Sequence, residues 1–226
     1  MNNKFRYAFF DFDGVIVDSE PDRLKTYKDL FLKIYDKKVE IDKYDIVGRP
    51  EDYNLRELLK FNQLNISKDV IKNLKTIRAE MLTNAASLGF PVIKKIYSII
   101  SVLKNMKIPM AIVTNSPRNY IANALRVLGI DEDNFIIITN DDVTTSKPDP
   151  EGYLKALSAF SCSCEEVLAF EDSPSGIKAA SMAGIEVVAV HSTFNKSSLE
   201  AKYHLELDIM TDDVTEIVSL FGGKYA

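Results

Sequence analysis

The sequence alternates between short apolar runs and longer amphipathic stretches, and this alternation restricts the fold more than any other feature. Five runs rich in aromatic and β-branched residues have the composition of buried strands: residues 7–12, 110–114, 135–139, 166–170 and 186–190. Several stretches between them place apolar residues three and four positions apart, which is the period of a helix that packs by one face. Strands that alternate with helices at this spacing predict an α/β protein with a parallel sheet covered on both faces.

The predicted helix ends carry the residues that helix termini favour. Ser116 and Pro117 supply an N-cap and a first-turn proline, and Gly129 follows the last apolar residue of that pattern. The same arrangement recurs over residues 173–184. Both segments therefore predict a helix directly after a strand.

A long segment after the first strand interrupts the alternation. Three helical patterns follow one another there with no strand between them. Their apolar positions are Leu24, Tyr27, Phe31 and Ile34, then Leu55, Leu58 and Leu59, and then Val70, Leu74, Ile77 and Met81. An insertion of about 70 residues is large enough for a small domain. We therefore predict a core domain of residues 1–17 and 88–226 and a helical cap domain of residues 18–87.

Composition excludes several classes of partner. The 226 residues carry a net charge of -5, which argues against a nucleic-acid or anionic-membrane partner. No apolar run approaches the ~20 residues that span a bilayer, and the N-terminus lacks a signal-peptide pattern. The two cysteines, Cys162 and Cys164, are too close together for the common zinc spacing or a disulfide framework. We expect a cytoplasmic protein.

Acidic, hydroxyl and basic side chains stand at or just after the carboxyl ends of four predicted strands. They are Asp11, Asp13, Thr114, Asn115, Ser116, Lys147, Glu171 and Asp172. Each group alone is also typical of turns, helix caps or solvated loops. In an open parallel sheet, however, ligands bind at the carboxyl ends of the strands near the point where strand order reverses. The four groups together therefore favour a functional site.

The chemistry of this set suits phosphoryl transfer. Several carboxylates form a site for a hard cation, and Mg²⁺ is the usual one beside a phosphate. One carboxylate can attack phosphorus, and a second two residues on lies on the same side of an extended segment, where it can act as general acid and base. A threonine, backbone N–H groups and a lysine can hold the phosphoryl oxygens. We predict that the site holds Mg²⁺ and a phosphoryl group.

Four segments resemble, in order and spacing, the motifs of the haloacid dehalogenase-like (HAD) superfamily over nearly the whole chain. They are "DFDGV" from Asp11, "VTNS" with Thr114, "SKPDP" with Lys147, and "FEDSPSGIKAASMAG" over residues 170–184. The helical insertion is similar to the C1-type cap of the β-phosphoglucomutase and sugar-phosphatase subgroup. The resemblance implies a Rossmann-like parallel sheet core with a small α-helical cap inserted after the first strand. Such proteins are often monomers, so we expect a monomer.

The resemblance also implies a role for each motif residue. Asp11 would be the nucleophile and Asp13 the general acid and base. Mg²⁺ would be held by Asp11, the backbone carbonyl of Asp13, Asp172 and, directly or through water, Glu171. The phosphoryl group would be bound by Thr114, Asn115 and Lys147. True dehalogenases of the superfamily lack the second aspartate of the first motif, so Asp13 argues against halide chemistry.

The cap would select the substrate. Arg49, in "VGRPED", lies where the cap specificity loop of this subgroup would fall and suits a sugar hydroxyl or a second phosphate. Glu20 lies at the hinge and could equally contact substrate or solvent. Arg23 stands near the place where β-phosphoglucomutases carry a histidine for proton handling, which counts against mutase activity.

Three functions follow from these observations. The first is a Mg²⁺-dependent phosphatase of a small phosphorylated metabolite, with a sugar phosphate as the expected substrate and an aspartyl-phosphate intermediate. The second is an isomerase of the β-phosphoglucomutase type. The third is a non-catalytic binding protein on the same scaffold, which the intact motif residues argue against. The sequence has no G-x-S-x-G, Walker or G-x-G-x-x-G motif, so it offers no support for a serine hydrolase or a kinase.

Overall fold

A six-stranded parallel sheet forms the centre of the protein. The computed structural model describes residues 4–41, 51–192, 198–201, 203–205 and 214–222. Within these residues the strands are β1 (Tyr7–Phe10), β2 (Met110–Val113), β3 (Phe135–Ile138), β4 (Val167–Glu171), β5 (Glu186–Val190) and β6 (Tyr203–Leu205). Their order across the sheet is β3-β2-β1-β4-β5-β6. Strand order therefore reverses at β1, which pairs with β2 on one side and β4 on the other.

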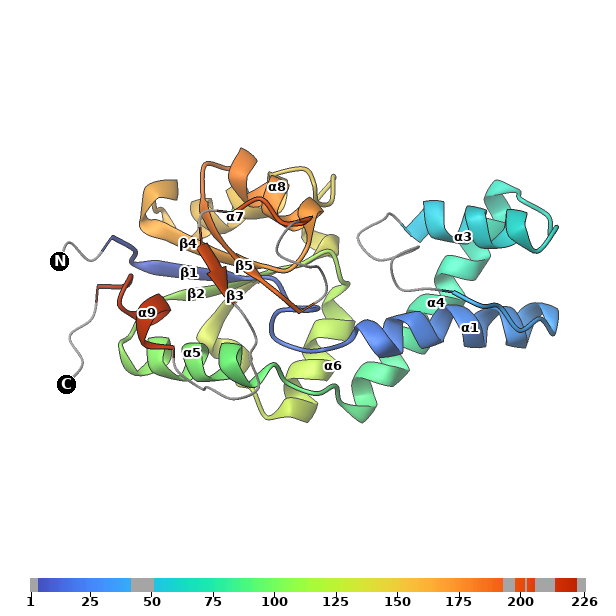
Figure 1. The fold of residues 1–226 in the computed structure, drawn as a ribbon, viewed down its shortest axis with the longest axis horizontal. Helices are drawn as coiled ribbons and strands as arrows, with labels where there is room; N and C mark the ends of the chain where they lie inside the picture. The colour runs from blue at the N-terminus through green and yellow to red at the C-terminus, as the bar shows by residue number, and fades with distance from the viewer. Residues whose placement is uncertain (1–3, 42–50, 193–197, 202, 206–213, 223–226) are drawn as a thin grey trace.

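Helices cover both faces of the sheet, as Figure 1 shows. One face packs against α5 (Lys94–Asn105), α6 (Arg118–Leu128) and the short α9 (Thr215–Val218). The other face packs against α7 (Glu151–Phe160) and α8 (Pro174–Met182). The short 3₁₀ turns η1 (Glu132–Asn134), η2 (Asn140–Asp142) and η3 (Cys164–Glu166) lie in the connections.

Adjacent residues of β1 supply the two layers of the core. Phe10 and Phe9 are both fully buried. Phe10 stacks on Phe170 of β4 with ring centroids 4.7 Å apart, and Phe9 stacks on Phe160 of α7. Because successive side chains of a strand point to opposite faces, a strand covered on both sides must be apolar throughout. This is the reason why the five longer strands were predictable as continuous apolar runs.

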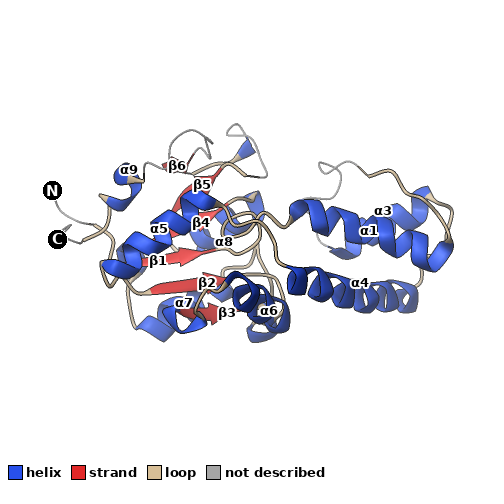
Figure 2. Ribbon diagram, turned by 90° about the horizontal axis from the view of Figure 1, so that it is seen from below, coloured by secondary structure: helices blue, strands red, loops and turns tan. Residues whose placement is uncertain are grey.

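The helical insertion forms a second unit beside the sheet (Figures 1 and 2). It contains α1 (Glu20–Tyr35), α3 (Glu51–Phe61) and α4 (Lys68–Leu88), which bury an apolar cluster of their own. Two connecting segments join it to the core and pair with each other: the N–H of Asp18 donates to the carbonyl of Pro91, and that of Ile93 to Ile16. The predicted fold class, a parallel sheet core with a helical cap, is confirmed. The domain boundaries at 17/18 and 87/88 stay predictions.

Two features differ from what the sequence predicted. The three-residue edge strand β6 was not predicted, because it is too short to show a period. Ser116 was predicted as an N-cap, but α6 begins at Arg118 with Pro117 in the cap position. The hydroxyl of Ser116 donates to Asp13 instead.

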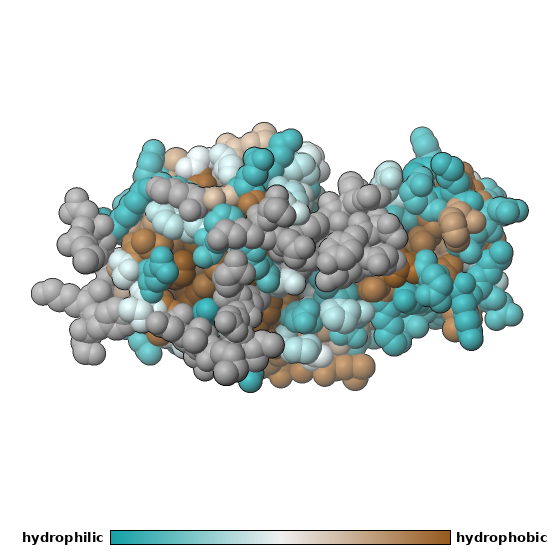
Figure 3. All heavy atoms as spheres, viewed as in Figure 1, coloured by the Kyte–Doolittle hydropathy of each residue, from teal (hydrophilic) through white to brown (hydrophobic). Residues whose placement is uncertain are grey.

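No described helix combines the length and the apolar composition that crossing a bilayer requires. The face shown in Figure 3 mixes hydrophilic residues with smaller hydrophobic areas.

Phe10→Ala should destabilise the fold strongly, because it removes a ring packed inside the sheet. We expect the free energy of unfolding to fall by about 3–5 kcal/mol in a urea titration. Phe61→Ala is the matched control, since the side chain of Phe61 is 83% exposed; its effect should stay within about 0.5 kcal/mol. Equal effects of the two variants would contradict this account of the core.

Candidate active site

A cavity of about 480 Å³ lies between the carboxyl edge of the sheet and the cap. The core contributes most of the residues predicted at the strand ends. These are Asp11, Asp13, Thr114, Asn115, Ser116, Lys147 and Asp172. The cap contributes polar and charged side chains from α1, α3 and α4. Ligands of open α/β sheets bind at the point where strand order reverses, and the cavity lies at that point, beside β1.

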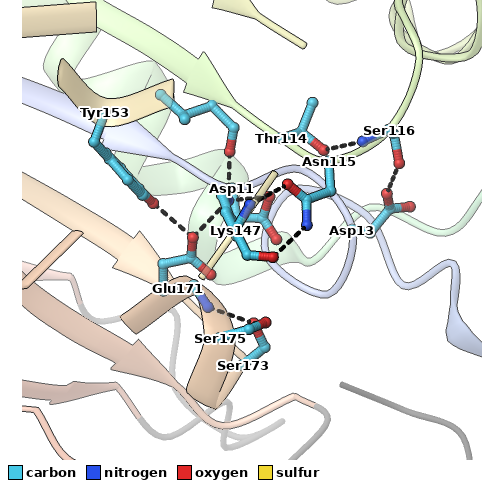
Figure 4. Close-up of polar contacts among 12 residues, drawn as sticks. Asp11, Asp13, Thr114, Asn115, Ser116, Lys147, Tyr153, Glu171, Ser173 and Ser175 are labelled. Atoms are coloured by element: carbon cyan, nitrogen blue, oxygen red, sulfur yellow. Dashed lines mark hydrogen bonds and ion pairs between the residues drawn. The ribbon is translucent and has the colours of Figure 1, made fainter. Parts of the chain in front are cut away.

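Lys147 lies at the centre of the core half of the site (Figure 4). Its Nζ donates to Asp11 Oδ1 at 2.9 Å, to Glu171 Oε1 at 2.6 Å and to the carbonyl of Val113 at 2.7 Å. The Lys147 side chain is only 6% exposed. Burial disfavours the charged ammonium, but the attraction of Asp11 and Glu171 outweighs it and raises the pKa of Lys147. Lys147 therefore joins the ends of three adjacent strands as a cation.

Asp11 and Glu171 are both buried, and their carboxylates share the single ammonium group of Lys147. Burial raises the pKa of Asp11 and of Glu171, and the attraction of Lys147 offsets this only in part. Repulsion by Asp11 raises the pKa of Glu171 further, and repulsion by Asp13 raises the pKa of Asp11. The site thus has an excess of negative charge that a further cation would balance.

Glu171 is fully buried, and its two oxygens differ in their contacts. Oε1 accepts from Lys147 and from the hydroxyl of Tyr153 at 2.6 Å, as Figure 4 shows. Oε2 has no hydrogen-bond partner among the described residues. A Cβ added at Gly176 would lie 1.9 Å from that oxygen. The first turn of α8 can therefore lie against this carboxylate only because residue 176 is a glycine.

Three carboxylates have the arrangement of a metal site. Asp11, Glu171 and Asp172 each offer one oxygen, and these oxygens lie within 4.8 Å of one another. Carboxylate oxygens are the ligands that Mg²⁺ prefers. The unpartnered Oε2 of Glu171 and the excess negative charge also fit a divalent cation. The side chain of Asp13 is not part of this cluster, and the predicted role of its backbone carbonyl stays a prediction.

The carboxylate of Asp13 is held by four donors outside the metal cluster. Oδ1 accepts from Ser19 at 2.5 Å and from the hydroxyl of Tyr120 at 2.6 Å. Oδ2 accepts from Ser116 at 2.5 Å and from Arg23 at 3.3 Å. Ser116 and Tyr120 belong to the core, whereas Ser19 and Arg23 lie at the start of the first cap helix. The position of Asp13 therefore depends on both parts of the protein.

The hydroxyl of Tyr120 donates a hydrogen bond to the carboxylate of Asp13. Its ring is buried between Phe12 and Phe90. Burial, and next the negative charge of Asp13, raise the pKa of Tyr120, so the hydroxyl keeps its proton.

Thr114 and Asn115 follow β2 and lie in the cavity wall. Thr114 is buried, and its Oγ1 accepts from the N–H of Ser116 at 3.1 Å. The side-chain amide of Asn115 pairs with the backbone of Lys147, accepting from its N–H at 2.9 Å and donating to its carbonyl at 3.3 Å. Asn115 thus fixes the loop that carries Lys147. Phosphate binding by Thr114, Asn115 and Lys147 stays a prediction.

Of the two residues that were predicted to bind substrate from the cap, the structure describes only Glu20. Glu20 lines the cavity, where its carboxylate lies 3.4 Å from the Nε of Arg23. Burial raises the pKa of Glu20, and Arg23 opposes this. Arg49 lies outside the described residues.

Several residues at this site were not predicted. Ser19, Tyr120 and Tyr153 place hydroxyls on Asp13 and Glu171, and Arg78 lines the cap side of the cavity. The tyrosines occupy apolar positions of helical patterns, which conceals their hydroxyls. Gly176 did carry a signal, because an isolated glycine inside a helical pattern lowers helix stability and so points to a packing or functional reason for it.

Known proteins resemble this chain along most of its length. A sequence model described as haloacid dehalogenase-like hydrolase matches residues 8–190. A validoxylamine A 7'-phosphate phosphatase of Streptomyces hygroscopicus is 30% identical over 219 residues, which cover 94% of this chain and 96% of the relative. A phosphorylated carbohydrates phosphatase of Thermotoga maritima is 31% identical over 203 residues, 86% of this chain and 90% of the relative.

The fold has solved counterparts as well. A putative β-phosphoglucomutase from Thermotoga maritima superposes with a TM-score of 0.71 at 29% identity, over 90% of this chain and 95% of the other. CbbY from Rhodobacter sphaeroides superposes with a TM-score of 0.78 at 20% identity, over 89% and 93%. The match runs from the first strand to the fifth and includes all four motifs, and two relatives of 30% identity or more align with most of the chain: this chain belongs to the haloacid dehalogenase-like hydrolases.

Proposed function

We propose that this chain is a Mg²⁺-dependent phosphatase that hydrolyses a phosphate monoester of a small, carbohydrate-like metabolite. The observation that carries the proposal is the buried Lys147 between Asp11 and Glu171, at the floor of a cavity that the cap covers. Two relatives that match most of the chain are named as phosphatases, one of validoxylamine A 7'-phosphate and one of phosphorylated carbohydrates.

Asp11 is the proposed nucleophile. A carboxylate oxygen of Asp11 attacks phosphorus, and the bond from phosphorus to the leaving alcohol oxygen breaks. Asp13 gives a proton to that oxygen and then takes one from the water that attacks the aspartyl phosphate, so that phosphate leaves and Asp11 is restored. Lys147 and Thr114 hold the phosphoryl oxygens during both steps. The cavity between core and cap supports this proposal because it offers space for a substrate in contact with these residues.

Asp11, Glu171 and Asp172 would hold the Mg²⁺. When bound, the cation supplies positive charge for the phosphoryl oxygens and balances the carboxylates. Asp11 could then act as a nucleophile beside Asp172 and Glu171, although the three acids repel one another.

The isomerase alternative finds less support. In the β-phosphoglucomutases the position near Arg23 carries a histidine that handles a proton, whereas the Arg23 guanidinium contacts Asp13 and keeps its own charge. An arginine there can orient Asp13 but cannot exchange a proton with it.

Asp11→Asn should abolish phosphate release while the fold survives, because an amide cannot form the acyl phosphate. We expect kcat to fall by about 1,000-fold or more on a panel of sugar, nucleotide and short-acid phosphates together with p-nitrophenyl phosphate. The exposed Asp69 gives the control, Asp69→Asn, which should retain activity. Thermal unfolding checks that both variants fold. Turnover by a folded Asp11→Asn protein would exclude the covalent route.

Tyr120→Phe should impair proton transfer to the leaving group more than any other step, because it removes one donor that orients Asp13. We expect a loss in kcat/KM of about tenfold for alkyl phosphates. The loss should be much smaller for p-nitrophenyl phosphate, whose phenolate leaves without a proton. Tyr97→Phe, on the exposed side of α5, serves as the control. A uniform loss on both substrates would assign Tyr120 a merely structural role.

Gly176→Ala should weaken Mg²⁺ binding, because the added methyl group displaces the Glu171 carboxylate. We expect the Mg²⁺ concentration for half-maximal thermal stabilisation to rise by about tenfold or more. Ser181→Ala, at an exposed position of the same helix, should leave it unchanged. If Gly176→Ala bound Mg²⁺ as the unaltered protein does, Glu171 would not be a ligand.

A further inference from the structure

The charges on the cap side of the cavity are paired with one another. Arg78 Nη1 lies 2.7 Å from Glu51 Oε1, Lys75 Nζ lies 2.6 Å from Asp52 Oδ1, and Arg23 Nε lies 3.4 Å from Glu20 Oε1. In the described part of the cap, these six side chains are the charged ones that line the cavity. Three cations face three carboxylates, so the described part of this wall has no net charge.

Arg78 is the most buried of the three cap cations. Its side chain is 3% exposed, and its guanidinium lies over the ring of Tyr27 at 3.6 Å. Nη1 donates to Glu51, and Nη2 donates to the carbonyl of Arg23 at 3.2 Å. Nε is buried and has no hydrogen-bond partner among the described residues. The polar contacts of this guanidinium among the described residues are therefore those of Nη1 and Nη2.

The groups around Arg78 alternate between donors and acceptors. The Glu51 carboxylate is partly exposed and can accept, and the side-chain amide of Asn54, which donates to Tyr27 Oη at 3.4 Å, lies on the same wall. A fixed guanidinium beside a fixed carboxylate matches neighbouring hydroxyl groups, each of which both donates and accepts.

An anionic group would interact less favourably with the same cap wall. A carboxylate or a second phosphate that contacted Arg78 there would lie beside the Glu51 carboxylate, which is held 2.7 Å from Arg78 Nη1 and would repel it. A neutral group with several hydroxyls meets no such repulsion.

We infer that the cap selects a leaving group that carries several hydroxyls and no charge, and that Arg78, held by Glu51, determines this selection. The inference rests on the proposed phosphatase function and makes its substrate class narrower: monophosphates of neutral polyols or sugars, rather than bisphosphates or phosphorylated acids. A purely structural Arg78 would clamp α1, α3 and α4 together without affecting this choice.

The first test compares kcat/KM for glucose 6-phosphate with that for phosphoglycolate and fructose 1,6-bisphosphate. The unaltered enzyme should prefer the neutral leaving group by about tenfold or more. Glu51→Gln keeps the size of the side chain but leaves the charge of Arg78 unbalanced. The ratio should therefore move toward phosphoglycolate by about tenfold. A preference of the unaltered enzyme for phosphoglycolate, or an unchanged ratio in a folded Glu51→Gln protein, would overturn the inference.

Two further variants serve this test, one as a substitute for Glu51→Gln and one as a control. Asp52→Asn releases Lys75 in the same way and replaces Glu51→Gln if that variant fails to fold. Asp29→Asn is the matched control, because Asp29 pairs with Lys25 on the exposed side of α1, outside the cavity; it should not move the ratio.

Binding to the Asp11→Asn protein, measured by calorimetry with glucose 6-phosphate and phosphoglycolate, reports the same selection without turnover. If the enzyme released no phosphate from any substrate, the proposed function would fail. The binding ratio would still support or overturn the selection by the cap.

Discussion

The contact of Lys147 with Asp11 and Glu171 is the interaction on which the rest of the site depends. One ammonium ties the ends of β1, β2 and β4 together, through two carboxylates and the carbonyl of Val113. Strands that reverse order at β1 bring these groups to one point, where the side chains of Lys147 and Glu171 are 6% and 0% exposed. Burial strengthens the charge interactions among them and makes an unbalanced charge costly.

The two halves of the cavity handle charge in opposite ways. The core half gathers carboxylates around one lysine and so attracts cations, whereas the cap half pairs each of its described cations with an acid. Asp13 lies between the halves and accepts from both. Under the proposed mechanism the reacting groups therefore belong to the core, and the cap supplies the surface that a leaving group would contact.

Sequence patterns predicted those parts of the protein where a residue type occurs mainly in one structural setting, such as a buried strand or a strand end. The parallel sheet followed from strands that are apolar on both faces, and the site followed from polar residues at strand ends, such as Asp11 and Lys147. The relatives confirm the predicted family and the predicted class of enzyme, a hydrolase of phosphate monoesters. Tyr120 and Tyr153 escaped prediction because they occupy apolar helix positions, and Arg78 because a charged residue on a helix is usually solvated. Only the three-dimensional contacts reveal what such side chains hold.

The glycine at position 176 has a consequence for how this site can change. Because the Glu171 carboxylate fills the space that a side chain would occupy, the first turn of α8 and the acid must vary together. A smaller acid at 171 would leave a void there, and any larger residue at 176 would push the carboxylate toward Lys147. An evolutionary path that altered one of them alone would pass through a protein with a damaged site. The two positions are therefore expected to covary across related sequences, with glycine retained wherever the longer acid is kept.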